Sequence, residues 1–333
     1  MPQSGEDNLI ARFFAPLAGE GGLGLKDDAA LIASEPGCDL VVTCDALVAG
    51  VHFFPEDPPD AIAAKALRVN LSDLAAKGAA PKGFILALAL PQTWSETLSE
   101  RERASDVWLT DFARGLAEDI AAYRCPLLGG DTVKTPGPLM ISITAFGVVP
   151  KGRMVPRTGA RLGDHLYVSG TIGDAALGLK IRLGQLAPAE GADHLLARYL
   201  RPQPRNALAP ALLDFASAAM DVSDGLVGDL AKMMRVSGVS AEVNAAAVPL
   251  SLAAASRVAK AGSAFETALT GGDDYEILAS VPPQNASAFE VAAAQAGVPV
   301  ARIGHVVAGE GAPVFRDASG APLAFARGSF SHF

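Results

Sequence analysis

Aspartate is the residue type whose placement in this sequence suggests chemistry, because it recurs directly after short apolar runs and often beside glycine. These aspartates are Asp27, Asp28, Asp45 and Asp131 in the first half of the chain, and Asp221, Asp224, Asp273 and Asp274 in the second. Open α/β sheets bind ligands at the carboxyl ends of their strands. Carboxylate oxygens are also the ligands that Mg²⁺ prefers. The pattern therefore indicates carboxylates that hold cations.

Each of these segments alone also has a structural explanation. Aspartate and glycine are common in turns, and Ser223 and Asp224 before the apolar Leu226 fit an ordinary helix N-cap. Asp73 is harder to explain in this way, because it interrupts an apolar helical pattern in which aspartate is poorly favoured. Several converging carboxylates would repel one another unless cations lay between them. The inference of a cation site therefore depends on the whole set.

Several familiar catalytic signatures are missing from the sequence. No segment fits the Walker A pattern GxxxxGK[ST], the protein-kinase HRD and DFG pairs, GxSxG or HExxH. The glycine-rich stretch 19–24 precedes Lys26, but no helical pattern follows it. We therefore interpret this stretch as a loop and not as a phosphate cradle at a helix N-terminus. Triad hydrolases and zinc peptidases are weakly supported.

Composition restricts the possible partners. Of the 333 residues, 50% are hydrophobic and 19% are charged, as in globular proteins, and the net charge is −9. Nucleic-acid binding usually requires a basic surface, so a nucleic acid is not an expected partner. An acidic protein that binds phosphates needs another source of positive charge. Divalent metal ions held by carboxylates would provide it.

The cysteines and the apolar runs indicate a cellular location. Cys38, Cys44 and Cys125 show no CxxC spacing and leave one cysteine unpaired, so a zinc site or disulfide framework is not indicated. The acidic N-terminus is unlike a signal peptide, and the apolar run 84–90 is far shorter than the ~20 residues of a membrane span. We therefore expect a soluble cytoplasmic protein with no membrane partner.

Alternating short apolar runs and longer helical patterns predict an α/β protein. An amphipathic helix is expected at 9–17, and Gly19 is a plausible C-cap. Strands are predicted at 39–43, 83–90, 139–149, 164–169, 241–244, 275–281 and 298–305, and further helices at 60–77, 100–123, 175–183, 226–236 and 286–296. The turn-rich segment 151–159 separates two similar halves. The predicted domains are therefore 1–150 and 151–333.

Five segments of the chain are similar to the thiamine-monophosphate kinase family, within the superfamily that contains aminoimidazole ribonucleotide synthetase. They are TCDALVAGVHF at 43–53, VNLSDLAAKGA at 69–79, GGDT at 129–132, DVSDGL at 221–226 and GGDDYE at 271–276. The resemblance runs along nearly the whole chain. It implies a two-domain aminoimidazole ribonucleotide synthetase-like fold, with an N-terminal mixed sheet and helices and a C-terminal α/β domain. The first domain would bind metal and ATP and form a homodimer, and the second would close over nucleotide and substrate.

Residue roles follow from the same resemblance. It implies that several Mg²⁺ ions are held by Asp28, Thr43, Cys44, Asp45, Asp73, Asp131, Asp221 and Asp224. The ATP phosphates would lie against Gly130, Asp131, Arg157 and Ser223, and thiamine monophosphate against His52, Asp273 and Phe330. The residues that act directly on the phosphoryl transfer would be Asp45, Asp73, Asp131 and Arg157. Arg157 has independent support, since a guanidinium in a glycine- and proline-bounded loop suits phosphate charge.

Three positions differ from the family pattern. Lys26 stands where glycine commonly precedes the paired aspartates. Cys44 replaces a hydroxyl residue, so a metal contact there would use its backbone carbonyl. Asp273 replaces the usual glutamate, which shortens the reach to substrate by one methylene group.

The reaction implied by the resemblance is ATP-dependent phosphorylation of thiamine monophosphate to thiamine diphosphate. Alternatives are another ATP-dependent member of the superfamily, or a silent nucleotide-binding or scaffold protein with this fold. A selenophosphate synthetase would need a reactive Cys or selenocysteine near the N-terminus, and the first 37 residues contain none. The retained aspartates argue against a silent protein.

Overall fold

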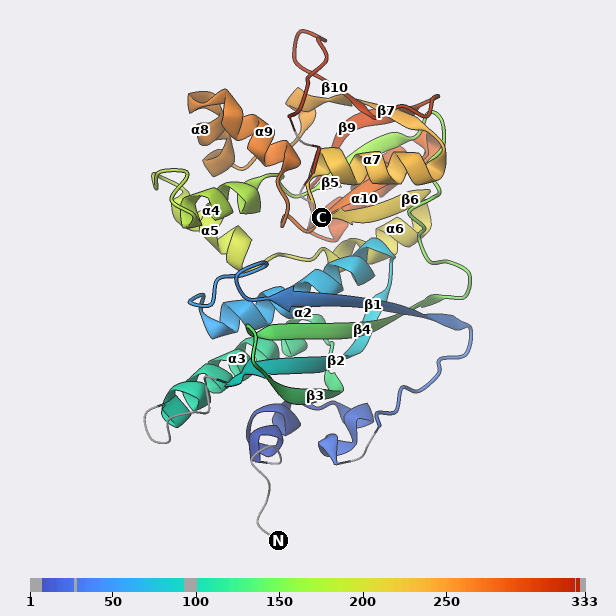
Figure 1. Cartoon of the computed structure of the whole chain (residues 1–333). Coiled ribbons are helices and arrows are strands. Elements are labelled where there is room, and N and C mark those ends of the chain that lie inside the picture. The colour runs from blue at the N-terminus through green and yellow to red at the C-terminus, as the bar shows by residue number, and fades with distance from the viewer. Residues whose placement is uncertain (1–7, 27–28, 93–100, 327, 330–333) are drawn as a thin grey trace. The chain divides into compact units, whose positions relative to one another are not determined.

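The computed structural model describes residues 8–26, 29–92, 101–326 and 328–329, and it consists of two compact units (Figure 1). The first unit extends to Leu74 and continues from Ala80 to Gly152. The second consists of Ala75–Ala79 and the chain from Arg153 onward. Each unit combines one sheet with helices, which confirms the predicted α/β fold class.

The first unit begins with a helical segment at residues 8–17, where the sequence predicted a helix at 9–17. It is a π-helix at Ile10–Phe14 and a 3₁₀ helix at Ala15–Leu17, and a separate 3₁₀ segment follows at Glu20–Leu25. Pro16 lacks an N–H group, which is compatible with the first turn of the 3₁₀ helix but not with a continuing α-helical hydrogen-bond ladder. The longer elements of this unit are β1 (Cys38–Val48), α2 (Pro59–Ala76), β2 (Ala80–Pro91), α3 (Arg101–Tyr123), β3 (Leu127–Thr135) and β4 (Met140–Pro150).

The sheet of the first unit has four strands in the order β1-β4-β2-β3. Strand β4 is antiparallel to both β1 and β2, whereas β2 and β3 are parallel. Along β4, buried Ile141, Ile143 and Ala145 alternate with half-buried Ser142 and Thr144. This alternation is typical of a sheet with one covered face. Helices α2 and α3 lie on that covered face, behind the sheet in Figure 1.

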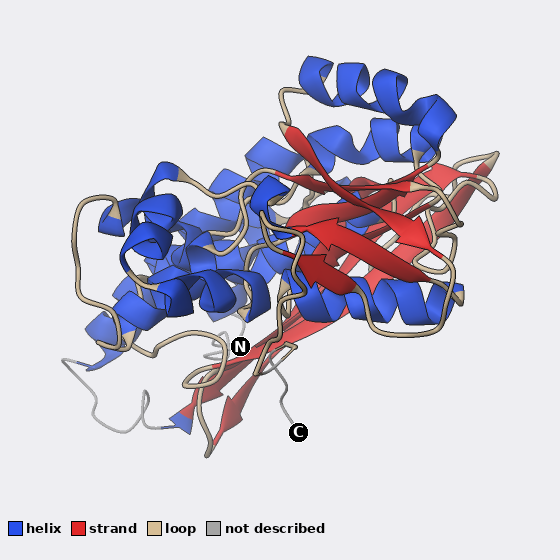
Figure 2. Ribbon diagram, turned by 90° about the horizontal axis from the view of Figure 1, so that it is seen from above, coloured by secondary structure: helices blue, strands red, loops and turns tan. Residues whose placement is uncertain are grey.

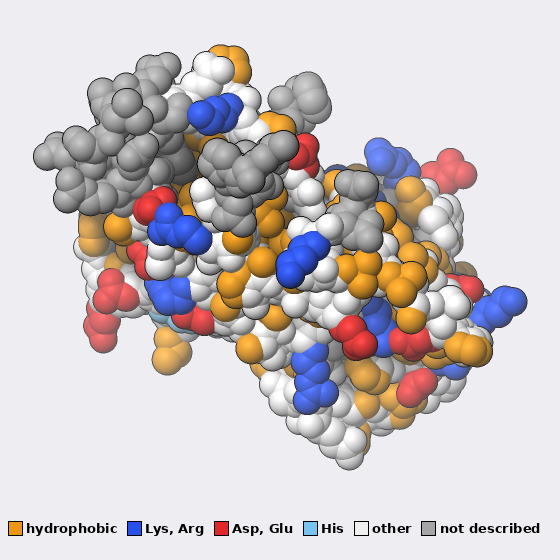
Figure 3. Space-filling model, turned by 90° about the horizontal axis from the view of Figure 1, so that it is seen from below, with side chains coloured by type: hydrophobic (Ala, Val, Ile, Leu, Met, Phe, Trp, Pro, Cys, Tyr) orange, Lys and Arg blue, Asp and Glu red, His pale blue; other side chains and the backbone are white. Residues whose placement is uncertain are grey.

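The opposite face, called the open face here, carries exposed apolar side chains. They are Leu40 and Val42 from β1, Ile85 from β2, Val133 from β3 and Met140 from β4. Leu40 and Val42 are more than half exposed, at 52% and 53%. Figure 3 shows hydrophobic side chains at many places on the surface that it displays. Apolar side chains gathered on one face of a sheet can mark an interaction surface.

Helix α2 is buried around nearly its whole circumference, because residues 61–67 all lie in the interior. Arg68 on α2 joins it to α3 by two hydrogen bonds to the carboxylate of Asp119, 2.8 Å from Nε and 2.7 Å from Nη2. Gly78 follows the helix in the left-handed region at φ 73°, where glycine is favoured. The helix is thus held firmly against the sheet.

The second unit contains a six-stranded sheet in the order β10-β7-β9-β5-β8-β6. Its strands are β5 (His165–Ser169), β6 (Ala218–Val222), β7 (Ser240–Asn244), β8 (Glu276–Val281), β9 (Val300–Val307) and β10 (Val314–Arg316). Its helices are α4 (Asp174–Arg182), α5 (Ala192–Leu200), α6 (Ala209–Phe215), α7 (Leu226–Ser237), α8 (Leu252–Lys260), α9 (Gly262–Thr270) and α10 (Ala286–Gln295). Neighbouring strands are antiparallel, except that β10 runs parallel to β7.

Both faces of this second sheet are covered (Figure 2). Leu166, Met220 and Leu278 pack with α7 on one face. Tyr167 and Ile277 belong to the core on the other face, which includes residues of α6 and α10. Because a hydrophobic core lies on each face of this sheet, its central strands carry apolar side chains on both sides. Within the described ranges of the chain, no helix has the length and apolar character to cross a membrane.

Candidate active site

Two predicted metal ligands face each other on the covered face of the first unit. Thr43 and Asp45 alternate with exposed Cys44 along β1 and share the covered side with buried Val41 and Leu47. The Thr43 hydroxyl donates a 2.5 Å hydrogen bond to Oδ2 of Asp73 on α2. Burial, and then the negative charge of Asp73, raise the pKa of Asp45 to about 6. The two carboxylates therefore form an electrostatically unfavourable pair that a cation would stabilise.

Asn70 fixes the spacing between these two carboxylates. Its side-chain Oδ1 accepts a 3.1 Å hydrogen bond from the backbone N–H of Asp45, and its Nδ2 donates to the carbonyl of Ala66. Asn70 lies three residues before Asp73, so both side chains are on one face of α2. The sequence analysis did not identify Asn70. A fully buried asparagine at helical spacing from Asp73 is the signal that could have found it.

Asp131 lies on the open face, away from Asp45 and Asp73. Across the four strands, Asp45 is in one row with Ile143, Leu86 and Gly130, whose side faces the helices. Asp131 is in the next row, with Ala87 and Ser142, and this row faces the other side of the sheet. An added Cβ at Gly130 would lie 1.9 Å from the carbonyl oxygen of Leu86, so only glycine fits there. Exposed Cys44 also faces the open side, where its Sγ lies 3.6 Å from Oγ of Ser142.

A cavity of about 540 Å³ lies beside Asp131 in the first unit. Its polar lining includes the backbone of 129–130, Asp131, Ser142 and Thr144. Apolar walls are supplied by residues of the N-terminal segment and of β2 and β3, namely Ile10, Phe14, Leu25, Ile85 and Leu128. Small-molecule sites commonly have this size and this mixture of apolar walls with a few polar groups.

His52 lies in a compact turn after β1. Its ring Nδ1 is 3.0 Å from the backbone nitrogen of Val48, and its carbonyl accepts a 3.0 Å hydrogen bond from Nζ of Lys65 on α2. Lys65 is only 2% exposed. The sequence analysis did not identify Lys65, although a lysine among buried alanines is an unusual residue to find there.

The second unit brings two predicted segments together at the carboxyl end of β6. The backbone N–H groups of Asp273 and Tyr275 donate to the carbonyls of Ser223 and Val222, each at 2.8 Å. Asp273 and Tyr275 both have left-handed backbones, at φ 73° and 52°. This conformation is uncommon for residues other than glycine, and it accompanies functional turns. Ser223 and Asp273 thus lie on adjoining loops.

Asp229 and Lys232 of α7 organise the segment around Asp224. One carboxylate oxygen of buried Asp229 accepts hydrogen bonds from the backbone N–H groups of Ser223 and Asp224, at 3.0 and 2.9 Å. Lys232 Nζ donates to Asp224 at 2.5 Å and to Asp229 at 2.9 Å. Any ligand contact of Ser223 would therefore use its hydroxyl. Asp224 already has a cationic partner in Lys232, which a metal ion would have to replace.

Two other predicted residues of this unit lie apart from Asp224. Asp221 pairs with Ile277 in the sheet and shares its side with the core formed by α6 and α10, whereas Asp224 is bonded to α7 on the opposite face. The carbonyl of exposed Arg157 accepts a 3.4 Å hydrogen bond from Ser237 at the end of α7. Helix α7 has 12 residues, so this end is roughly 17 Å from its start near Asp224.

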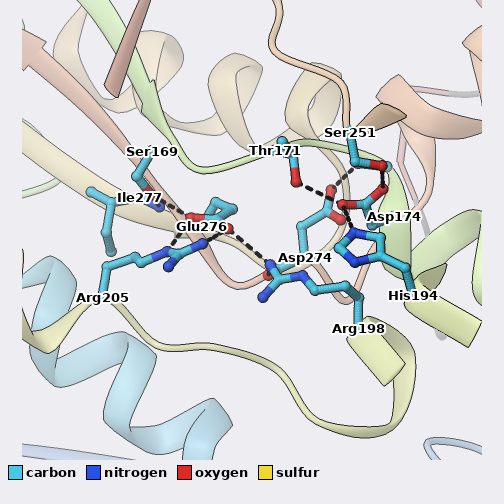
Figure 4. A network of polar contacts seen from close by, with 11 residues as sticks. Ser169, Thr171, Asp174, His194, Arg198, Arg205, Ser251, Asp274, Glu276 and Ile277 are labelled. Atoms are coloured by element: carbon cyan, nitrogen blue, oxygen red, sulfur yellow. Dashed lines mark hydrogen bonds and ion pairs between the residues drawn. The ribbon is translucent and has the colours of Figure 1, made fainter. Parts of the chain in front are cut away.

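A buried polar network is formed around Asp274 and Glu276, which follow Asp273 in the sequence (Figure 4). Glu276, which is fully buried, accepts hydrogen bonds from Arg198 at 2.8 Å and from Arg205 at 2.6 and 2.5 Å. Asp274 is 1% exposed, and its Oδ2 accepts a 2.8 Å hydrogen bond from the N–H of Gly173. Burial raises the pKa of Asp274 well above its usual value. The network ties the Asp273 turn to α4 and α5.

The same network continues to the start of α4. Asp174 accepts hydrogen bonds from Thr171 at 2.6 Å and from Ser251 at 2.5 Å, and His194 Nε2 lies 3.1 Å from it. Gly170, at φ 55°, packs directly on this network, since an added Cβ would lie 2.1 Å from Glu276 Oε1. The sequence analysis overlooked these partners, because they are distant in sequence from the GGDDYE segment.

The oxygen donors of the first unit suit Mg²⁺ in chemical type, but they form only part of a site. Asp45, Asp73 and Thr43 supply hard oxygen atoms. Among the described residues, however, no group of three or more His, Cys, Asp and Glu side chains is close enough to hold a metal ion. Asp28 and Phe330, predicted to bind metal and substrate, lie outside the described residues.

Comparison with family models identifies an N-terminal and a C-terminal domain in the chain. Residues 26–149 match the AIR synthase related protein N-terminal domain, and residues 161–316 match the corresponding C-terminal domain. Together these matches cover most of the 333 residues. They also confirm the fold predicted for both halves of the chain.

Similar proteins are known by sequence and by structure. The thiamine-monophosphate kinase of Caulobacter vibrioides is 47% identical over 315 residues, which cover 93% of this chain and 86% of that protein. The crystal structure of thiamine-monophosphate kinase from Stenotrophomonas maltophilia has a TM-score of 0.79 and 38% identity, covering 95% of this chain and 96% of that one. AaThiL complexed with AMPPCP and TMP has a TM-score of 0.77 and 32% identity, with coverages of 92% and 91%.

Proposed function

We propose roles for individual residues on the premise that the chain belongs to the thiamine-monophosphate kinase family, whose two AIR synthase related domains it contains. It is an ATP-dependent kinase that phosphorylates thiamine monophosphate to thiamine diphosphate. The activity is phosphoryl transfer, so the protein must align two phosphates and offset their negative charge. The contacts within each unit support the following assignment of ligands to residues.

In the first unit, Asp45, Asp73 and Thr43 hold Mg²⁺, together with Asp28 and the backbone carbonyl of Cys44. The observation that carries this proposal is the raised pKa of Asp45, which burial and the neighbouring Asp73 produce. A divalent ion at this position would convert repulsion into attraction. When bound on this covered face, Mg²⁺ would supply positive charge to phosphates that reach Asp45 and Asp73, separately from an ion held by Asp131 on the open face. Several Mg²⁺ ions would bind at the active site.

The nucleotide is proposed to use the cavity beside Gly130 and Asp131. Its walls combine the apolar side chains of Phe14, Leu25 and Ile85 with an exposed strip of backbone at 129–130. An adenine ring suits the apolar walls, and phosphates suit exposed N–H groups and an ion held by Asp131. The cavity volume of about 540 Å³ is within the usual range for small-molecule sites.

In the second unit, we assign phosphate and substrate contacts to the adjoining loops around Ser223 and Asp273. The Ser223 hydroxyl would contact an ATP phosphate, because its N–H already donates to Asp229. Asp221 and Asp224 are proposed as further metal ligands on separate faces of the sheet. Asp273 would contact thiamine monophosphate from its left-handed turn, as would Phe330. Arg157 remains a proposed phosphate contact from a different part of this unit.

The acceptor chemistry requires little from the protein. A phosphate monoester has its second pKa at about 6 and is largely ionised near neutral pH. Its oxygen can therefore attack the γ-phosphorus of ATP in line without a general base, unlike a hydroxyl acceptor. Positioning and charge neutralisation then provide most of the catalysis.

The open face of the first unit is proposed to pair with a second copy of the chain. Leu40 and Val42 of β1 expose apolar surface outside the cavity, on a sheet whose other face is already covered. A two-fold axis would place the same face of each copy against the other, which is the commonest arrangement of soluble homo-oligomers. Burial of this face would remove apolar area from water. The active protein is thus proposed to be a homodimer.

We propose a cytoplasmic location for the protein. The described part of the chain has no helix able to cross a membrane, and its cysteines are free thiols. Free thiols persist in reducing compartments. ATP, its co-substrate, is also a cytoplasmic metabolite.

The proposed function is tested with purified protein, ATP, Mg²⁺ and thiamine monophosphate. Thiamine diphosphate and ADP should appear in equal amounts, and chelation of Mg²⁺ with EDTA should stop both. A silent nucleotide-binding protein would produce neither. A synthetase with a different acceptor would form no thiamine diphosphate and would release ADP only when that acceptor was added.

A further inference from the structure

The ammonium group of Lys232 lies between two carboxylates at the start of α7. Its Nζ donates to Oδ2 of Asp224 at 2.5 Å and to Oδ1 of Asp229 at 2.9 Å. These two partners differ in their surroundings, since the side chain of Asp224 is 35% exposed and that of Asp229 is fully buried. Lys232 therefore connects a carboxylate that solvent can reach with one that it cannot.

Asp229 is the partner that Lys232 must keep. The other oxygen of Asp229, Oδ2, already accepts the backbone N–H groups of Ser223 and Asp224, so Oδ1 is the oxygen that faces the ammonium. A buried carboxylate is costly unless a positive charge accompanies it. Asp229 and Lys232 are three residues apart on one helix, which places them on the same face of α7. This pair is therefore a fixed part of the second unit.

Asp224 is the partner that can be exchanged. Its backbone N–H is held by Asp229, so the loop keeps its position whether or not its side chain contacts Lys232. An ion pair between partly exposed side chains contributes little to stability, because solvent screens the two charges. Both side chains of this pair are about one third exposed. A second cation can therefore take an oxygen of Asp224 without unfolding the loop.

From these contacts we infer that Lys232 competes with Mg²⁺ for the carboxylate of Asp224 and so sets the affinity of that position for the ion. The inference rests on the proposed role of Asp224 as a metal ligand and adds the residue that opposes it. Two carboxylates and one ammonium give Asp224, Asp229 and Lys232 a combined charge of −1, which bound Mg²⁺ would change to +1. Lys232 thus weakens binding of the ion, but it leaves the loaded group positive and attractive to a phosphate of ATP.

A double-mutant cycle measures the competition at Asp224 alone. Calorimetric titration with Mg²⁺, without nucleotide, should show about 10-fold tighter binding to Lys232→Met than to the unaltered enzyme, because a competing positive charge has been removed. In the Asp224→Asn background, Lys232→Met should not change the affinity for Mg²⁺. Lys232→Arg keeps the charge and should keep the weak binding. Lys180→Met on α4, which removes a lysine bonded to the neutral side chain of Gln185, is the matched control.

Nucleotide binding provides a second measurement. At saturating Mg²⁺, Lys232→Met should bind the non-hydrolysable analogue AMPPCP about 10-fold more weakly, because the loaded group then has no net charge. Competition therefore predicts opposite changes in the affinities for ion and nucleotide, whereas a purely structural lysine would weaken both. Thermal unfolding establishes that each variant is folded. If Lys232→Met does not fold, Lys232→Gln retains an N–H donor for Asp229 and takes its place in both measurements.

The inference is overturned if removing the charge of Lys232 leaves the affinity for Mg²⁺ unchanged or weakens it, or if the effect persists in the Asp224→Asn background. It is also overturned if the affinity for AMPPCP at saturating Mg²⁺ does not fall, or if Lys232→Arg binds Mg²⁺ as tightly as Lys232→Met. The proposed function is tested separately, by formation of thiamine diphosphate from thiamine monophosphate with the unaltered enzyme. Failure of the competition would leave that result intact.

Discussion

Asp73 on α2 faces Asp45 on β1, and its carboxylate adds to burial in raising the pKa of Asp45 to about 6. Thr43 donates to the same Asp73, and Asn70 holds the backbone of Asp45 from one helical turn away. The fold thus keeps two negative charges close together in a poorly solvated place. Such an arrangement reduces stability and is expected where a cation binds.

Replacing Asp45 with Asn should stabilise the metal-free protein at neutral pH. The folded-state pKa of Asp45 is raised from 3.8 to about 6. Protonated Asp45 does not destabilise the folded state, so the full free energy of unfolding is present below pH 3.8. Ionisation of Asp45 then lowers that free energy as the pH rises through about 6. The loss is on the order of 3 kcal/mol at pH 8. Urea unfolding of Asp45→Asn without divalent ions should show a smaller decline between pH 4 and pH 8; an unchanged decline would contradict the assigned environment.

Asp73→Asn should eliminate Mg²⁺ binding between Asp45 and Asp73 without loss of the fold. Asparagine keeps the size of the side chain and its hydrogen bond from Thr43, but it removes the charge. Activity should fall by orders of magnitude, and the rise in melting temperature on adding Mg²⁺ should disappear. Asp111→Asn on the exposed surface of α3 is the control and should behave normally. Near-normal turnover by folded Asp73→Asn protein would remove Asp73 from the metal site.

Glu276→Gln should destabilise the second unit strongly. Glu276 is fully buried and bonded to both Arg198 and Arg205, so removing its charge leaves two guanidinium groups without their counter-charge. Breaking a buried ion pair in this way costs about 3 to 5 kcal/mol. The surface pair of Glu118 with Arg114 provides the matched control, and Glu118→Gln should cost less than about 1 kcal/mol. Equal effects in denaturant unfolding would show that the buried network is not a main source of stability.

Val42→Asp should dissociate the proposed dimer. The substitution places a charge in the apolar open face, where Val42 is 53% exposed in the single chain. The unaltered protein should sediment at twice its 34.1 kDa chain mass at micromolar concentration, and the variant at the chain mass. Leu252→Asp is the control, since Leu252 is an isolated apolar side chain that is 93% exposed in the second unit. A monomeric unaltered protein would exclude this role for the open face.

Hydrophobic periodicity predicted most of the long elements. The helices expected at 60–77 and 226–236 correspond to α2 and α7, and the strand at 139–149 corresponds to β4. It did not predict β3, whose GGD residues resemble a turn, or β6, which ends at the aspartate-rich segment 221–224, and it also missed the helices α5, α6, α8 and α9. The helix expected at 9–17 is present as a helical segment at 8–17, but it has π and 3₁₀ geometry where an ordinary α-helix was expected.

The candidate site was predictable in residue type but not in partners. The position of Asp73 within an apolar helix indicated a functional aspartate, and the structure places it beside Thr43 and close to Asp45. The placement of Asp131 on the open face depends on strand register, which the sequence does not specify locally. The arginines around Glu276 are 71 and 78 residues distant from it in sequence, so no short motif contains them.

The most direct test of this account is a comparison of two acceptors, thiamine monophosphate and free thiamine, in separate incubations with enzyme, ATP and Mg²⁺. A phosphate acceptor is already ionised and can share Mg²⁺ with ATP, whereas the hydroxyl of thiamine needs a positioned base. Chromatography should therefore show thiamine diphosphate from the monophosphate, with an equal amount of ADP, and negligible phosphorylation of thiamine. Comparable rates with both acceptors would contradict the metal-assisted transfer to a phosphate proposed for this enzyme.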